Sequence, residues 1–301
     1  MAIVNATYIN KCIETMINDE YEHILVDTEG SENVNDSNEN NESNDISGFS
    51  SDYEAIKGAF GNGCSNGNFC NHSITKEDIF RQLVLIDSLY STNIQRMRAY
   101  GIDEIAEDIY KLCGNGSEKH TLGTLTHKID ITKPLHHNIA SIFTKNYGWI
   151  KGERNWSAPS LISKYLFFAT IVCPRNKWGF PIFDTIVCDL LRSMQKRLSI
   201  PLTPTKNFSL VNGVLDINIY IDGLKRIIDA LETDNPTLWS SVSTTKFQLL
   251  DHFLWHIGKA GRKSYNLLLT KSEIKNCYKG RKLIRLPQRI LIWEQIYNSI
   301  K

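Results

Sequence analysis

From about residue 75 onward, apolar side chains recur every three or four positions, and this spacing constrains the fold more than any other feature. The first such run is carried by Ile79, Leu83, Ile86 and Tyr90. It starts at a capping-box pattern, Thr75 with an acid at Asp78, that is typical of a helix N-terminus. Further runs with helical spacing lie near residues 135–146, 159–172, 183–198, 213–232, 245–257 and 284–299. Alternating strand patterns are scarce, so the sequence predicts an all-α fold.

The first quarter of the chain has a different composition. Residues 1–26 are predicted to form an N-terminal helix, and residues 27–74 an acidic, Asn/Ser-rich flexible linker that cannot bury enough apolar surface to fold. Within this linker Cys64, Cys70 and His72 lack the tight spacing of zinc modules, so no metal or cofactor is predicted. The remaining residues, 75–301, are predicted to form the helical domain.

Charge is distributed unevenly along the 301 residues, although the formal net charge is only +1. Residues 1–60 hold 13 acidic residues against 2 lysines, whereas residues 246–301 hold 12 basic residues against 3 acidic ones. The basic end favours a polyanionic partner, and the acidic end repels one or shields the basic face. No run of eighteen apolar residues and no secretory signal is evident, so no membrane contact is expected. Seven irregularly spaced cysteines suit free thiols, which predicts an intracellular location.

One stretch, SLISKYLFFATIVCPRNKWGFPIFDT at residues 160–185, carries two charges in an unusual setting. Lys164 opens an apolar helical run, and Asp184 follows a second apolar segment. In one interpretation Lys164 reaches solvent and Asp184 caps a helix. In the other, apolar neighbours desolvate the amine and lower its pKa, which makes it a nucleophile that Asp184 orients. The residues alone leave both interpretations open.

Three short motifs resemble the helix-hairpin-helix DNA glycosylase superfamily, nearest to its 8-oxoguanine DNA glycosylase/AP lyase branch. APSLISK lies over the family hairpin Leu-Pro-Gly-Val-Gly-Thr-Lys, and FPIFD lies over its Val-Pro-Val-Asp segment. The resemblance implies that Lys164 is the Schiff-base lysine and Asp184 the catalytic aspartate. It also implies a two-lobed architecture, with Ser160 and Ser163 of the hairpin contacting DNA.

The third motif, STNIQRM, is similar to the family stretch that enters the gap left by the flipped base. It assigns DNA contacts to Ser91, Asn93 and Arg96. On the late helical run KFQLLDHFLWHIGK, Asp251 and Trp255 are four residues apart and share a helix face. The resemblance implies that they line the base pocket, Trp255 by stacking and Asp251 by reading the polar edge of the base. The other interpretation has Trp255 in the core and Asp251 in solvent.

The chain departs from the family at several positions. Ser160 and Ile162 replace the two hairpin glycines, Ile186 replaces a phosphate-contacting histidine, and no four-cysteine iron–sulfur pattern is present. The predicted function is a bifunctional DNA glycosylase that excises a damaged or modified base, an oxidised purine such as 8-oxoguanine being favoured. Its partner is duplex DNA with a flipped base, and the protein is expected to act as a monomer. The alternative is a catalytically inactive helix-hairpin-helix protein that binds DNA or regulates another protein.

Overall fold

The architecture was obtained as a computed structural model, in which helices dominate. The structure describes residues 6–7, 9–10, 13–14, 55–60, 69–89, 101–114, 119–145, 147, 158–184, 187, 215–241 and 244–254. The helices with described bounds are α3 (Lys76–Leu89), α4 (Ile102–Cys113), α5 (Leu122–Lys128), α6 (His137–Ile142), α7 (Pro159–Val172), α9 (Ile217–Asp234) and α10 (Pro236–Ser241), with a 3-10 turn η1 at Phe69–Asn71. Residues 246–254 are also helical. Within these ranges no strand occurs, which confirms the all-α prediction at this level.

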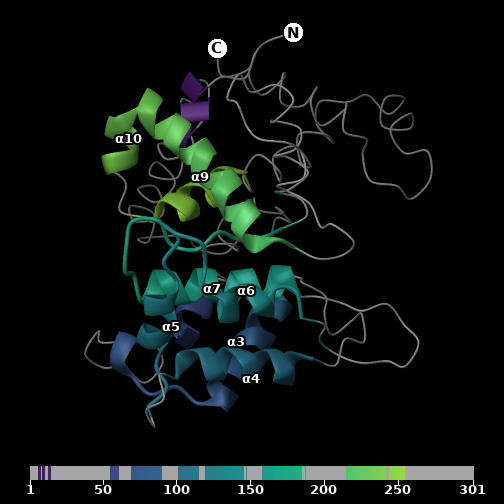
Figure 1. Cartoon of the computed structure of the whole chain (residues 1–301). Coiled ribbons are helices and arrows are strands. Elements are labelled where there is room, and N and C mark those ends of the chain that lie inside the picture. Colours follow the sequence, from purple (N-terminus) through teal and green to yellow (C-terminus); the bar gives the residue numbers. More distant parts are fainter. Residues whose placement is uncertain are drawn as a thin grey trace, which may run out of the picture.

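The described helices form layers around a shared apolar core. Figure 1 shows α3 and α4 on one side of α7, and α9 with α10 on the other. The buried apolar residues of all these elements belong to one contiguous cluster. Helix α7 therefore lies in the middle of the described fold, with neighbours on both sides.

Local sequence signals explain where several helices begin. The capping box before α3 is confirmed: the amide of Asp78 donates to Thr75 Oγ1 at 3.1 Å, and the amide of Thr75 donates to Asp78 Oδ2 at 3.0 Å. Asp216 caps α9 by accepting a hydrogen bond from the Ile219 amide at 3.2 Å. Pro159 stands at the first position of α7, where its missing N–H costs no helical hydrogen bond.

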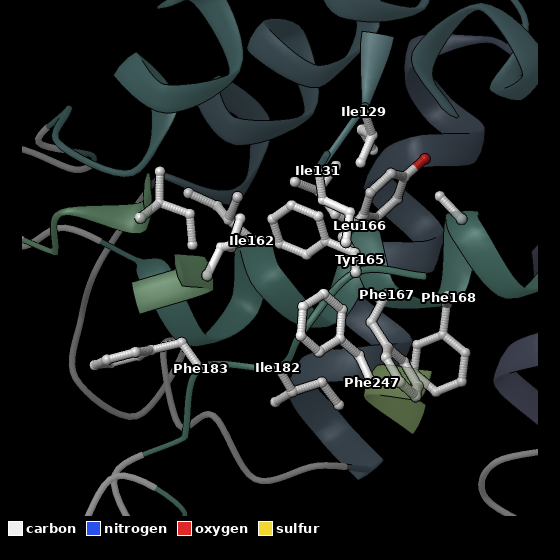
Figure 2. Close-up of a cluster of buried hydrophobic side chains, with 14 of the residues drawn as sticks. Ile129, Ile131, Ile162, Tyr165, Leu166, Phe167, Phe168, Ile182, Phe183 and Phe247 are labelled. Atoms are coloured by element: carbon white, nitrogen blue, oxygen red, sulfur yellow. The ribbon is translucent and has the colours of Figure 1, made fainter. Parts of the chain in front are cut away.

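Helix α7 buries side chains on every face, as expected of a helix enclosed by others. All of residues 161–170 are buried. Figure 2 shows its side chains between Ile129 and Ile131 on one side and Ile182 and Phe247 on the other. One polar contact ties α7 to α3, because the Tyr165 hydroxyl donates to Gln82 Oε1 at 2.9 Å in the interior.

The N-terminal part of the chain contributes to this same core. The described residues between 6 and 14 are helical, and Ile9 and Ile13 are fully buried. Residues 55–60 are helical, and Ile56 and Phe60 are buried, although they fall inside the predicted flexible linker. Both short segments thus place apolar side chains in the core that the later helices form.

The helices of the described residues were compared with the requirements of a membrane span. None of the described helices combines the length and the apolar character that a bilayer span requires.

Candidate functional site

Lys164 is the only charged residue of α7, and its position in the helix shows whether its side chain reaches solvent. It is the sixth residue of α7, in the second turn, and only 3% of its surface is exposed. The sequence had allowed a lysine at the helix start that reaches solvent, and the structure excludes that. The helix begins five residues earlier, at Pro159, so the amine is enclosed within the fold.

Asp184 lies beside this buried amine. The distance between Lys164 Nζ and Asp184 Oδ2 is 3.7 Å, and the side chains are 4% and 22% exposed respectively. Two residues twenty positions apart in the sequence therefore form an ion pair with one open side. The carboxylate is the more accessible partner, so a ligand would approach the pair from the Asp184 side.

Two buried hydrogen bonds hold the segment before Asp184 against its neighbours. The amide of Phe183 donates to Ser163 Oγ at 2.8 Å, and the Tyr220 hydroxyl of α9 donates to the carbonyl of Ile182 at 2.6 Å. Because Ser163 immediately precedes Lys164, the first of these bonds fixes both charged residues to the same place. Buried bonds of this kind are costly to break, since each leaves an unsatisfied polar group.

The helix at 246–254 adds a third charged residue, Asp251, and is itself anchored near the site. The amide of Lys246 donates to the carbonyl of Lys177 at 2.7 Å, and the next amide donates to the carbonyl of Trp178 at 3.0 Å. The loop that leads to Asp184 thus also positions the first turn of the helix that carries Asp251. The segments that carry Asp184 and Asp251 are therefore attached to each other through backbone hydrogen bonds.

Gly179 allows the loop after α7 to pass close to the start of the 246–254 helix. Its φ is +69°, a left-handed conformation that side chains disfavour. A Cβ atom at this position would lie 2.5 Å from Thr245 Oγ1, just before the 246–254 helix. The glycine is therefore required twice, for its backbone angle and for the space it leaves.

The electrostatics of the site follow from burial and from the charges gathered there. Burial lowers the pKa of Lys164, and the negative charges of Asp184, Asp251 and Asp87 oppose that effect. Burial raises the pKa of Asp251 to about 7; the charge of Asp184 acts in the same direction and that of Lys164 against it. The carboxyl of Asp251 is thus poised between its charged and neutral forms near neutral pH.

The predicted site residues divide into those that the structure brings together and those it does not describe. Lys164 and Asp184 form the ion pair described above, and the charge of Asp251 acts on Lys164. Ser160 is half-buried in the first turn of α7, a helix end without a side-chain cap. The remaining predictions, Ser91, Asn93, Arg96 and Trp255, lie outside the described residues.

Ser163 differs from its predicted role as a DNA contact. Its side chain is fully buried, and its hydroxyl accepts from Phe183 and donates to the carbonyl of Ser160 at 3.1 Å. A phosphate has no access to it, because the helix places Ser163 on an enclosed face. The residue instead supports the backbone next to the ion pair.

Asp87 is a member of the cluster that the sequence interpretation missed. It lies on α3, is 5% exposed, and its charge acts on Lys164. A signal was available, because Asp87 is four residues after Leu83 and so shares the apolar face of the helix. An acid on a buried face requires a compensating partner, and here Lys164 on α7 is one source of compensation.

A buried amine with several carboxyl neighbours can act chemically as a nucleophile and as a proton donor or acceptor. An adjacent carboxylate can stabilise a positive charge that develops on a bound substrate.

Comparisons of the chain with protein-family models, with curated proteins and with solved structures found no match.

Proposed function

We propose that this protein is a DNA glycosylase with AP lyase activity, in which Lys164 forms a Schiff base with the sugar of a flipped nucleotide. The observation that carries the proposal is the buried amine of Lys164, 3.7 Å from a partly exposed Asp184. The motif resemblance assigned these two residues to catalysis from sequence. Their meeting in space is what the proposed reaction requires.

The chemistry uses each residue in a defined way. The neutral amine of Lys164 attacks C1′ of the sugar, and the bond between C1′ and the base breaks. Asp184, as a carboxylate, stabilises the positive charge that grows on the sugar during this step. The Schiff base that follows permits elimination at the neighbouring carbon and cleavage of the strand. Low solvent exposure of Lys164 favours its neutral, nucleophilic form.

The substrate we propose is a damaged or modified base in duplex DNA, with oxidised purines such as 8-oxoguanine favoured by the motif resemblance. Such an enzyme must take the nucleotide out of the stack to reach C1′. The basic composition of residues 246–301 would hold the phosphates, so binding is expected to weaken as salt increases. The two-lobed helix-hairpin-helix arrangement and the monomeric state belong to the same proposal.

Borohydride trapping tests the proposal, because it converts the Schiff base into a stable covalent link. Wild-type protein should be trapped on duplexes that contain an abasic site or the excised base. Lys164→Met keeps the size of the side chain but lacks the amine, so trapping should fall to background. Lys164→Arg keeps the positive charge and should also fail, because a guanidinium is not a nucleophile under these conditions.

A second lysine supplies the matched control. Lys128 is half-buried and donates to the carbonyls of Leu112 at 2.7 Å and Gly114 at 2.5 Å, a structural role at the end of α4. Lys128→Met should retain trapping, with thermal unfolding recorded for every variant. Trapping that persists in Lys164→Met would place the nucleophile elsewhere. Absence of trapping by the wild type on every duplex, with DNA binding intact, would favour the inactive DNA-binding alternative.

A further inference from the structure

One peptide group, which joins Ile182 to Phe183 immediately before Asp184, is held by side chains on both of its polar atoms. Its N–H donates to Ser163 Oγ of α7 at 2.8 Å, and its carbonyl accepts from the Tyr220 hydroxyl of α9 at 2.6 Å. Both bonds are buried, and the side chains of Ser163 and Tyr220 are fully enclosed. Two hydroxyl groups therefore satisfy this peptide group, as backbone partners would in a helix or a sheet.

These two bonds determine how the peptide group is rotated. Residues 179–184 belong to no helix or strand, so the regular hydrogen bonding of such an element does not orient them. The side chains of Ile182 and Phe183 are buried in the apolar cluster (Figure 2), but apolar packing has no preferred direction. Hydrogen bonds do have one. The hydroxyls of Ser163 and Tyr220 are therefore the directional contacts of this part of the loop.

The position of the hydrogen-bonded peptide group connects it to the ion pair. Ser163 immediately precedes Lys164, and Phe183 immediately precedes Asp184, so one buried hydrogen bond joins the residue before the amine to the residue before the carboxylate. The side chain of Asp184 is short, and its carboxylate follows the direction of its backbone closely. A rotation of the preceding peptide group would therefore move Asp184 Oδ2 relative to Lys164 Nζ, from which it is 3.7 Å away.

We propose that Ser163 and Tyr220 are positioning residues, which hold the Asp184 carboxylate where it stabilises positive charge on the sugar. This inference rests on the proposed glycosylase function and assigns to the site two residues that are too enclosed to contact DNA. They act through the backbone of the loop and take no part in bond making or breaking. Their hydroxyls should matter strongly, because a misplacement of about 1 Å in a catalytic group can cost about 10²-fold in rate.

Removal of each hydroxyl tests the proposal. Tyr220→Phe keeps the ring, which packs edge-on against Phe183 with 5.4 Å between the ring centroids. This variant and Ser163→Ala should each slow single-turnover excision by about 10²-fold, while DNA affinity stays close to wild type. Thr170→Val is the matched control: it removes a buried hydroxyl of α7 that donates to the carbonyl of Phe167 at 2.9 Å, within the same helix. Its excision rate should stay close to wild type.

Combination with Asp184→Asn separates positioning from a general structural effect. In that background no carboxylate charge remains to be placed, so Tyr220→Phe should slow excision by less than about 2-fold. If the hydroxyl supported the fold in general, the two losses would multiply. Full slowing by Tyr220→Phe in the Asp184→Asn background would therefore overturn the proposal.

Amide hydrogen exchange gives a readout that needs no substrate. In wild-type protein the Phe183 amide should exchange about as slowly as amides in the middle of α7, and in Ser163→Ala about 10-fold faster or more. Should both hydroxyl variants fail to fold, the wild-type measurement still decides, because rapid exchange at Phe183 would overturn the proposal. Failure of wild-type trapping on abasic DNA would refute the proposed function itself. Normal wild-type trapping with unchanged excision in both variants would refute only this inference.

Discussion

At the scale of single residues, Lys164 and Asp184 differ in how far solvent reaches their side chains. Lys164 is almost wholly enclosed, whereas Asp184 keeps about a fifth of its side chain exposed. The amine therefore depends on its protein neighbours for its charge state, and Asp184 is the group that a bound sugar would meet first. A substitution at Asp184 changes the group that a bound sugar would meet and leaves the amine of Lys164 in place. A substitution at Lys164 removes the amine itself.

Asp184→Asn should slow excision by about 10²-fold or more while folding and DNA affinity stay close to wild type. Asparagine has nearly the same size, but it lacks the negative charge opposite the developing cation. The ammonium of Lys164 retains Asp87 and Asp251 as compensating charges, so the fold should tolerate the change. Single-turnover excision and equilibrium DNA binding, measured in parallel, check this. An unchanged rate would show that the carboxylate has no catalytic part.

The raised pKa of Asp251 has a consequence for stability that needs no substrate. Its ordinary pKa is 3.8 and its folded value is about 7, so between these values the folded protein holds a proton that the unfolded chain has lost. The contribution of this group to the free energy of unfolding therefore falls as the pH rises from 4 to 7. Asp251→Asn should remove a slope worth on the order of 3 kcal/mol over that window. Urea unfolding at several pH values checks it, and parallel curves for wild type and variant would contradict it.

At the scale of elements, the site depends on how the loop after α7 is attached to its neighbours. Backbone hydrogen bonds from the 246–254 helix to Lys177 and Trp178, and the bond from Phe183 to Ser163, fix the middle and the C-terminal end of this loop. Two of the three carboxyl groups near Lys164 are thereby placed by a single connection. A substitution that strains this loop should therefore displace both Asp184 and Asp251.

Gly179→Ala should destabilise the fold by about 2 kcal/mol, because it combines an unfavourable φ of +69° with a close contact to Thr245. It should also reduce excision more than DNA binding, since the loop positions Asp184 and Asp251. Gly58→Ala is the matched control: a Cβ there meets nothing within 4 Å, and the residue lies in a helix, where alanine is favoured. Chemical denaturation of both variants tests this, and equal stability of the two would contradict the role of Gly179.

At the scale of the whole molecule, the N-terminal segment packs against α9 and α10, more than 200 residues later in the sequence. Asn10 donates to the carbonyl of Leu231 at 2.8 Å and accepts from Trp239 Nε1 at 3.0 Å, both in the interior. Figure 1 shows the described N-terminal residues beside α9 and α10. The chain ahead of the acidic stretch is therefore part of the folding unit.

Asn10→Ala should cost about 2 kcal/mol of stability, because it leaves the buried indole N–H of Trp239 without its acceptor and removes one of the two hydrogen bonds to the Leu231 carbonyl. Thr7→Ala, in the same segment, removes only an exposed hydrogen bond to Asp234 and should cost less than about 0.5 kcal/mol. Fluorescence and circular dichroism should report one shared unfolding transition for Asn10→Ala. A separate early transition with the remaining helices intact would mean that the N-terminal segment folds independently.

The sequence by itself determined those features whose causes lie within a few residues. The capping box of Thr75 and Asp78 joins residues three apart, and the apolar run at 159–172 matches the bounds of α7. Helix type follows from such local spacing, because apolar residues with period 3.6 can be buried on one face whatever the partner is. The pairing of Lys164 with Asp184 was likewise a sequence hypothesis, but it depended on motif resemblance rather than on spacing.

Only the tertiary structure decided the environment of those residues. The burial of Lys164 depends on helices that pack over α7 from both sides, and no local pattern specifies which face of an apolar helix will meet a charge. Asp87 and Asp251 are 164 positions apart in the sequence, yet both act on the same amine. Their effect depends on distance and on exclusion of water, and both are properties of the packed molecule. For this reason the sequence could nominate the nucleophile, whereas the protons that its carboxyl neighbours hold follow only from the fold.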